Sequence, residues 1–407
     1  MNEFSEIKLG SAVTFQRGFD ITKAEQSPGI VPIISSSGIS SYHNKVKVKA
    51  PGVIIGRKGT LGTVHFIGQD FWPHDTTLWV KDFKGNIPQF VAYFLRTLRL
   101  DNFDTGSSNP TLNRNHIHKI KILFPEDPVT QRKIAAILTA YDDLIEVNKR
   151  RTALLEKMAE ELYREWFVRL RFPGYKNTRF VKGVPEGWKM QQIEDAFEFT
   201  GGGTPSKSVP GFWADGTVNW FTPSDITGAA GIFCSDSEDR CSEEGLARSS
   251  ARLFPAYSVM MTSRATIGAI GINTTPACTN QGFITCIPNE KYPLPYLYQW
   301  LKLARPYFEQ LCGGATFPEL TKGTFKKLEI LSPTEEVIEA FTERSAPIFT
   351  TIENLLEQNQ NLTKTRDLLL PRLISGKLSV EDLDIQFPPS MQEVPVEQES
   401  PPEARRA

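Results

Sequence analysis

The sequence predicts an α+β protein in which two mixed α/β domains, related by a pseudo-two-fold repeat, are separated by two long, antiparallel, coiled-coil-like helices. Three observations support this fold class: the chain repeats part of itself, a long segment of helix-forming residues follows each copy, and apolar residues recur every seven positions in both segments. The chain has 407 residues, which exceeds one ordinary domain. Hydrophobic residues make up 40% of it, enough for a core in each domain.

Composition argues against several classes of protein. The formal net charge of −1 disfavours a free-standing, strongly basic nucleic-acid binder, but allows a basic face or a binder whose partners supply charge. The five cysteines include no pair two residues apart and no nearby histidine, which favours reduced thiols over a zinc site or disulfides. The acidic N-terminus does not resemble a signal peptide, and no apolar run approaches the roughly 20 residues that span a bilayer. We therefore expect a soluble, cytoplasmic protein.

Three pairs of segments reveal the internal repeat. IKLGSAVTFQRG at 7–18 resembles QIEDAFEFTGG at 192–202, and PGVIIGRKGTLGTV at 51–64 resembles YSVMMTSRATIGAI at 257–270. GSSNPTLNRNHIHKIKILFP at 106–125 resembles GATFPELTKGTFKKLEILSP at 314–333. The spacing between matched residues grows from 184 to 208, which places an insertion in the second copy between about Gly203 and Tyr257.

Each copy is expected to be a mixed, strand-rich domain. Short β-branched or aromatic runs such as Gly52–Ile55 and Leu78–Val80 lie between turn residues and predict strands. One helical stretch precedes the shared ending in each copy, at Gln89–Leu98 and at Pro295–Leu303.

The first long helix is predicted from Pro128 to about Val168, a stretch without an internal proline or glycine. Two rows of residues seven apart form its expected seam: Ile134, Tyr141, Asn148, Leu155 and Leu162, with Leu138, Ile145, Thr152, Ala159 and Trp166. Asn148 lies in that seam, where a polar residue costs stability but fixes the register.

The second long helix is predicted from about Pro347 to Leu373, with Ser345 as its cap and Gly376 after its end. Its rows are Ile348, Leu355, Leu362 and Leu369, with Ile352, Asn359, Arg366 and Leu373. Asn359 matches Asn148, which favours antiparallel pairing of the two helices over the alternative of two unrelated helical tails.

These features divide the chain into five regions. A first domain occupies 1–127, a first helix 128–170, a second domain 171–334, and a second helix 335–380. The remainder, 381–407, is rich in proline and glutamate and is expected to be disordered.

At this point the sequence resembles the specificity subunits of type I restriction–modification systems from about Phe4 to Leu378. The segments that carry the resemblance are FPEDPVTQRKIAAIL leading into NKRRTALLEKMAEELYREWF, GGGTPSKSVPGFWADGTVNWFTPSDIT, and RDLLLPRLISGKL. The resemblance implies that each domain is a target-recognition domain for one half of a bipartite, asymmetric DNA sequence. It also implies that the helices recruit two adenine methyltransferase subunits, which restriction subunits join, in host defence. S-adenosylmethionine, ATP and magnesium would then bind to the partner subunits, with no cofactor on this chain.

Two segments resemble nucleotide-binding or nuclease motifs only in part. GGGTPSKS at 201–208 departs from a phosphate-binding loop, because Ser206 replaces the glycine before the lysine and Pro205 lacks an N–H. NRNHIH at 113–118 superficially resembles a nuclease cluster, but its repeat partner contains no histidine. We find no Asp/Asn-Pro-Pro-aromatic motif of adenine methyltransferases, so we expect a non-catalytic subunit without a metal site.

Candidate DNA-binding residues are cations and hydroxyl groups on turns that recur in both copies, although each could be a solvated surface group. In the first copy they are Lys45, Lys47, Lys49, Arg57, Lys58, Thr60, Thr111, Asn113, Arg114 and Lys119. In the second they are Ser224, Asp225, Arg264, Thr266, Thr321, Lys322, Lys326 and Lys327. The three lysines at 45–49 alternate along an expected strand, as a phosphate track or an ordinary exposed face. Ser224 and Asp225 either face bases or organise a turn.

Tyr163, Trp166 and Phe167 are candidate contacts for a partner subunit, with core packing at the domain junction as the equal alternative. The seam from Ile134 to Trp166 would span roughly 50 Å at about 1.5 Å per residue, enough to space two DNA contacts. A different class of function stays open: a coiled-coil scaffold whose repeated domains bind protein or glycan.

Overall fold

The computed structural model describes residues 4–103, 111–312 and 318–392. These residues form two compact units. The first unit comprises the described residues up to Val147 and those from Gln360 onward, and the second comprises those from Asn148 to Asn359. In the part of the chain that is described, no helix is long and apolar enough to cross a membrane.

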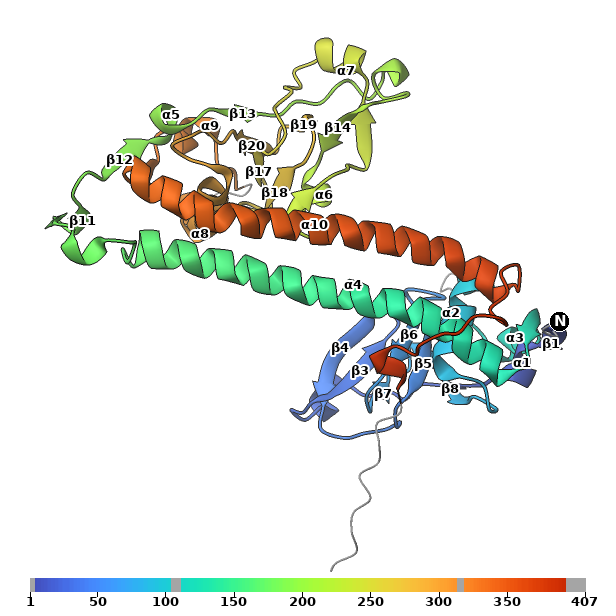
Figure 1. Cartoon of the computed structure of the whole chain (residues 1–407). Coiled ribbons are helices and arrows are strands. Elements are labelled where there is room, and N and C mark those ends of the chain that lie inside the picture. Colours follow the sequence, from blue (N-terminus) through green and yellow to red (C-terminus); the bar gives the residue numbers. More distant parts are fainter. Residues whose placement is uncertain (1–3, 104–110, 313–317, 393–407) are drawn as a thin grey trace, which may run out of the picture. The chain divides into compact units, whose positions relative to one another are not determined.

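The first unit is built on strands that pair into three small sheets (Figure 1). The strands are β1 (Phe4–Lys8), β2 (Thr14–Arg17), β3 (Val31–Ser35), β4 (Gly38–His43), β5 (Gly52–Gly56), β6 (Val64–Ile67), β7 (Trp72–Pro73), β8 (Thr77–Asp82) and β9 (Lys121–Pro125). Their orders are β2-β8-β5-β6, β4-β3-β7 and β1-β9. The helices are α1 (Leu9–Ala12), α2 (Pro88–Thr97), α3 (Arg114–Ile117), the first part of α4 (Pro128–Tyr163) and the last part of α10 (Glu335–Ile374). Shorter 3-10 turns cover Lys23–Glu25, Leu100–Phe103 and Pro389–Met391.

The second unit repeats this plan with additions. Its strands are β10 (Phe180–Val181), β11 (Val184–Pro185), β12 (Lys189–Gln192), β13 (Phe199–Gly201), β14 (Val218–Phe221), β15 (Phe233–Cys234), β16 (Asp239–Cys241), β17 (Val259–Thr262), β18 (Ile270–Asn273), β19 (Ala277–Thr279), β20 (Phe283–Cys286) and β21 (Glu329–Ser332). Its helices are the last part of α4, α5 (Ile193–Ala196), α6 (Pro223–Thr227), α7 (Glu243–Ala247), α8 (Leu294–Leu311), α9 (Lys322–Phe325) and most of α10 (Glu335–Ile374). Its 3-10 turns cover Tyr175–Asn177 and Pro210–Phe212.

The two units share one topology. The order β13-β20-β17-β18 in the second unit matches β2-β8-β5-β6 in the first, and β15 adds a fifth strand. The sheet β16-β14-β19 matches β4-β3-β7, and in both the last two strands are parallel. The antiparallel pair β12/β21 matches β1/β9. The repeat seen in the sequence is therefore a repeat of structure, and the α+β fold class is confirmed.

Helices α4 and α10 lie side by side and antiparallel within each unit (Figure 1). In the second unit, Asn148 Nδ2 donates to Asn359 Oδ1 at 3.1 Å, and the rings of Trp166 and Phe341 lie 5.8 Å apart. In the first unit, Arg366 forms an ion pair with Asp142. Residue numbers thus rise along α4 as they fall along α10. After Tyr163, α4 continues as one π-helical turn, Arg164–Val168.

The seam residues lie between these helices and the domain cores, and differ in how deeply they are buried. The buried ones are Ile134, Leu138, Ile145, Asn148, Ile348, Ile352 and Leu355. The half-buried ones are Tyr141, Leu155, Leu162, Asn359, Leu362 and Leu369. Apolar seam residues of each unit join that unit's own hydrophobic core.

The second long helix begins earlier than predicted, at Glu335 rather than Pro347. Ser345 is not a cap: it is fully buried inside the helix, and its hydroxyl donates to the carbonyl oxygen of Phe341 at 2.8 Å. Ile338 and Phe341 belong to the core of the second unit. Their burial stabilises helical turns before Pro347, which overrides the local signal of a helix start.

The tail is ordered further than predicted. Val380 and Met391 are buried against the first unit, Arg132 lies 4.4 Å from the ring centroid of Phe387, and Lys133 Nζ donates to the carbonyl oxygen of Glu381 at 2.6 Å. The prediction of disorder from 381 onward is therefore wrong up to Gln392. The rest of the tail lies outside the described residues, as do positions 106–110 and 314–317 of the third repeated pair.

Candidate nucleic-acid interface

The same tight turn follows β5 in the first unit and β17 in the second. The N–H of Gly62 donates to the carbonyl oxygen of Gly56 at 3.0 Å, and that of Gly268 donates to Thr262 at 2.8 Å. Gly62 and Gly268 have φ angles of 72° and 77°, which favour glycine. A Cβ on Gly62 would also lie 2.6 Å from the backbone nitrogen of Asp101. Both glycines identified in the repeat therefore shape the turn.

The second predicted group lies on a short loop before α3 and α9. Asn113 and Thr321 are the N-caps of these helices and accept hydrogen bonds from the N–H groups of Asn115 and Thr324. Ile117 and Phe325 anchor the two helices in the cores. The cations that this arrangement leaves exposed are Arg114 and Lys119 in the first unit and Lys322 and Lys327 in the second. Lys326 pairs with Glu194 at 2.9 Å and is a less available cation.

The structure brings the two predicted groups together in both units. A β-bridge joins Lys58 to Thr111 in the first unit, and the equivalent bridge joins Arg264 to Glu319 in the second. Each bridge is thus formed by a residue of the turn and a residue of the loop. The repeat spacing identified each group separately, and the fold makes them neighbours.

Buried leucines secure this contact. The N–H of Leu112 donates to the carbonyl oxygen of Arg57 at 3.0 Å, and that of Leu320 donates to Ser263 at 2.9 Å. Both leucine side chains are buried in the core of their own unit. The buried leucines therefore hold the turn and the loop against the core. The side chains exposed to solvent are Lys58, Thr60, Arg264 and Thr266.

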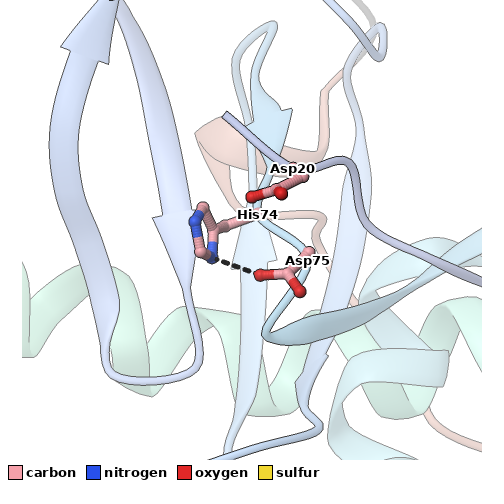
Figure 2. Close-up of side chains that lie close together, drawn as sticks. All are labelled: Asp20, His74 and Asp75. Carbon is pink, nitrogen blue, oxygen red and sulfur yellow. Dashed lines mark ion pairs between the residues drawn. The ribbon is translucent and has the colours of Figure 1, made fainter. Parts of the chain in front are cut away.

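Beside the first turn lies a cluster of charges that the sequence did not reveal. Arg17 pairs with Asp75 at 2.7 Å, and a terminal nitrogen of Arg57 donates to the backbone oxygen of Asp75 at 3.4 Å. Figure 2 shows that His74 and Asp20 lie near Asp75, with His74 Nδ1 at 3.2 Å from an Asp75 oxygen. Asp20, His74 and Asp75 lie outside the three repeated segments, and Arg17 aligns with Gly201 in the second copy, so the repeat did not indicate this cluster.

The charges around Asp75 determine how these groups ionise. Burial raises the pKa of the Asp75 carboxyl, but the hydrogen bond from Arg17 and the charges of His74, Arg17 and Lys58 outweigh it, and that pKa lies below its ordinary value. Burial and the charge of Arg17 lower the pKa of Arg57, opposed by Asp75. Three side chains, Asp20, His74 and Asp75, are close enough to share an ion. Because Asp75 already pairs with Arg17, we interpret this cluster as acidic groups that hold cationic side chains in place.

The second turn borders a polar pocket of about 330 Å³. Arg264 Nε donates to Glu319 at 2.8 Å, and both side chains are about half exposed, at 52% and 40%. Lys322, Thr321 and Gln281 also line the pocket. Glu319 was not predicted, although the spacing of 208 aligns it with Thr111 and could have indicated it.

The lysines at 45–49 do not share a strand face as predicted. Residues 44–50 form a loop that contains only an isolated bridge at Val48. Lys47 Nζ lies 4.6 Å from the ring centroid of Phe19, and Lys49 pairs with Asp70 at 2.7 Å. Lys45 is exposed. The strand prediction is wrong because aromatic and ionic contacts of the individual lysines hold this loop.

Asp225 organises a turn rather than facing a base. Its carboxylate accepts hydrogen bonds from the N–H and hydroxyl of Thr222 at 2.7 and 2.6 Å, and from the N–H of Glu238 at 2.9 Å. Ser224 is exposed in the first turn of α6. The neighbouring Asn219 is buried and donates to Ser235 and Thr275.

Tyr163, Trp166 and Phe167 are not free for a partner. All three are buried in the core of the second unit, where Phe167 contacts Tyr296 and Phe341 at ring-centroid distances of 4.8 and 4.9 Å. The alternative, core packing, therefore applies. Heptad counting places Trp166 in the seam but not Phe167, whose ring is also buried at the π-helical turn that contains both residues.

Helix α4 exposes a different set of apolar residues. Leu154 and Met158 are 68% and 52% exposed in the second unit, and Leu144 and Val147 are 41% and 45% exposed in the first. Leu154 and Met158 are four residues apart and share one face of the helix in the second unit, and Leu144 and Val147, three apart, do so in the first. We call Leu154 and Met158 the α4 stripe. Long apolar side chains in a row on the surface are typical of a site for another protein.

Comparison with known proteins gives a consistent picture. The family model for the type I restriction modification DNA specificity domain matches residues 1–157 and 185–365. The MjaIX specificity subunit of Methanocaldococcus jannaschii is 35% identical over 192 residues, 47% of this chain and 44% of that protein. The HindI specificity subunit of Haemophilus influenzae is 28% identical over 334 residues, 66% of this chain and 71% of that protein.

A solved structure has the same fold. The S subunit of a type I restriction–modification system from M. genitalium superposes with a TM-score of 0.63 at 15% sequence identity, covering 94% of this chain and 97% of that chain. At this identity, the likeness concerns the fold alone.

Proposed function

Because the chain belongs to the family of type I restriction–modification DNA specificity domains, we propose that it is the non-catalytic DNA-recognition subunit of such a system. Each unit reads one half of a bipartite, asymmetric target. The observation that carries this proposal is the duplicated bridge between turn and loop, at Lys58–Thr111 and at Arg264–Glu319. We call each bridged turn and loop, with its exposed side chains, a frame. Two equivalent frames in one chain fit a target that has two parts.

The side chains on these frames have the chemistry that DNA requires. Lysine and hydroxyl groups grip phosphate, while arginine can also read guanine through two parallel hydrogen bonds. The exposed groups at each frame, Lys58 and Thr60 in one unit and Arg264 and Thr266 in the other, supply both kinds. A chain with a net charge of −1 binds DNA more strongly when partner subunits contribute positive surface.

The partners that we propose are two adenine methyltransferase subunits and the restriction subunits that join them. The methyl donor S-adenosylmethionine, ATP and magnesium bind to those partners. The α4 stripe supports a helix-mediated contact, because an apolar row at helical spacing fits the apolar face of a partner helix.

A coiled-coil scaffold with protein- or glycan-binding domains is the rival function. Family membership favours DNA recognition, and so does the presence of exposed cations at equivalent positions in the two frames. The two functions differ in what the chain adds to a methyltransferase: a scaffold changes assembly, whereas a specificity subunit changes which DNA sites are modified.

The test is methylation sequencing of a whole genome. Cells that express this chain with the methyltransferase encoded beside it are compared with cells that express the methyltransferase alone. The proposal predicts a new adenine-methylated motif with two short half-sites separated by a gap of fixed length. A stable complex that creates no new motif would contradict it and favour the scaffold.

A further inference from the structure

At the second frame, the ion pair between Arg264 and Glu319 occupies one edge of the guanidinium group. Arg264 Nε donates to Glu319 Oε1 at 2.8 Å, which engages the side of the guanidinium that carries Nε. The edge formed by the two terminal nitrogens then remains for another acceptor. This edge presents two parallel donors, and guanine presents two matching acceptors, O6 and N7, in the major groove.

The backbone around this pair is held from several directions. Besides the bridge between Arg264 and Glu319, the N–H of Ser263 donates to the carbonyl oxygen of Gly282 at 2.7 Å, and Ala265 has a φ of 57° that the closed turn imposes. A side chain that starts from a fixed backbone and is fixed again at Nε has little freedom left to lose on binding. Such restraint is what reading a single base requires.

The surroundings of the pair favour a base over a phosphate at Arg264. Glu319 places a negative charge beside the guanidinium, which weakens the attraction of Arg264 for a phosphate but leaves its hydrogen-bond geometry intact. Lys322 lines the same pocket and has no such acidic partner among the ion pairs of the described residues. Lys322 is therefore better suited to grip the backbone of the same DNA.

We propose that Arg264, positioned by Glu319, reads a guanine in the half-site bound by the second unit, and that Lys322 contacts phosphate there. This inference rests on the proposed function and makes it more specific. In the first unit the equivalent pair is Lys58 and Thr111, which lacks both the planar guanidinium and the carboxylate. We therefore assign this guanine contact, made by an arginine positioned by a carboxylate, to the second half-site.

The experiment compares methylated motifs from cells that co-express the methyltransferase with the wild-type chain or with one of five variants. For Arg264→Ala, the preference for guanine at one position of one half-site falls roughly 10- to 100-fold, while the other half-site stays unchanged. Arg264→Lys retains methylation through its charge but reduces the same preference. The control Arg248→Ala removes another exposed, ion-paired arginine of the same unit and leaves the motif intact.

Variants at Glu319 test positioning. Glu319→Gln retains an oxygen that accepts from Arg264 Nε, so it keeps the guanine preference, whereas Glu319→Ala weakens it severalfold. A merely structural role would lower expression in both variants without changing the motif. Loss of a cytosine preference in the Glu319 variants would overturn the inference, because Glu319 would then read a base itself.

The outcomes separate the inference from the function on which it rests. If the wild-type chain creates no motif, the proposed function fails. If it creates a motif that Arg264→Ala leaves unchanged, or that Arg248→Ala changes at the same position, the guanine contact fails and the proposed function stands.

Discussion

The two units present different chemistry on the same backbone. The first frame carries Lys58 next to Thr111, and the second carries Arg264 next to Glu319 at the equivalent bridge. Near the first frame, Arg17 and Arg57 gather around Asp75, whereas Ser263 replaces Arg57 in the second unit. The hydrogen bonds of the turns are nevertheless the same in both. A duplicated fold can therefore hold two different recognition surfaces.

This difference shows at which positions a residue can change with little effect on stability. The geometry that the two units share depends on backbone hydrogen bonds, on glycines with positive φ, and on the buried Leu112 and Leu320. Among the side chains that differ, Lys58, Arg264 and Glu319 are exposed. Substitution of exposed groups usually changes stability little, so the reading surface can diverge while the frame persists.

The largest effects are expected at the leucines that hold the frames. Leu112→Ala and Leu320→Ala each create a cavity and should lower the local unfolding free energy by about 2–5 kcal/mol. Hydrogen exchange followed by mass spectrometry measures this, and each substitution should reduce protection in its own unit. Equal loss of protection in both units after either substitution would contradict two separately held frames.

The next largest effect is expected on methyltransferase binding, when an exposed apolar residue of α4 is replaced. Leu154 in the α4 stripe is exposed, whereas Trp166 is buried, so Leu154→Asp should leave the second unit folded and weaken methyltransferase binding tenfold or more. Binding measured by calorimetry with the purified methyltransferase provides the test. Ala153→Asp, which adds the same charge on a different exposed face of α4, is the matched control and should bind normally. Similar losses for both variants would remove the stripe from the interface.

The smallest effect is a pH dependence confined to the first unit. His118 Nε2 accepts the N–H of Phe15 at 3.0 Å, and burial, together with the charges of Arg114 and Lys84, lowers the pKa of His118. The folded state therefore binds a proton less readily than the unfolded state, and stability should be lost as pH falls from about 6.5 toward that lower pKa.

Thermal unfolding of the wild-type chain and of His118→Gln between pH 7.5 and 5.5 measures this dependence. Glutamine keeps an acceptor for Phe15 but does not titrate, so the variant should lose less stability on acidification. The equivalent residue in the second unit is Lys326, which pairs with Glu194, so the substitution concerns the first unit alone. An identical loss for both proteins would exclude His118 as the cause.

Much of the fold followed from the sequence where local pattern and packing agree. The first long helix was predicted from Pro128 to about Val168, and it runs from Pro128 to Tyr163 with a π-helical turn to Val168. The internal repeat correctly indicated two similar domains. Both signals are encoded locally, by residue spacing and by matched turns.

Other features depend on contacts that no local pattern records. Burial of Phe341 extends α10 through Pro347, and at the π-helical turn Phe167, which lies in neither seam row, is buried in the core. In the candidate interface, the repeat located Lys58 and Arg264, but Arg17 and Asp75 meet from separate segments. Such neighbours become visible only when the chain is folded.

The most direct test exchanges the bridged residue pairs of the two frames. Lys58→Arg with Thr111→Glu gives the first frame the pair of the second, and Arg264→Lys with Glu319→Thr makes the reverse change. Methylation sequencing of each double variant, co-expressed with the methyltransferase, should show a guanine preference gained in one half-site and weakened in the other. Changes that fall in the same half-site for both variants, or in neither, would contradict the claim that two equivalent frames read two different halves of one target.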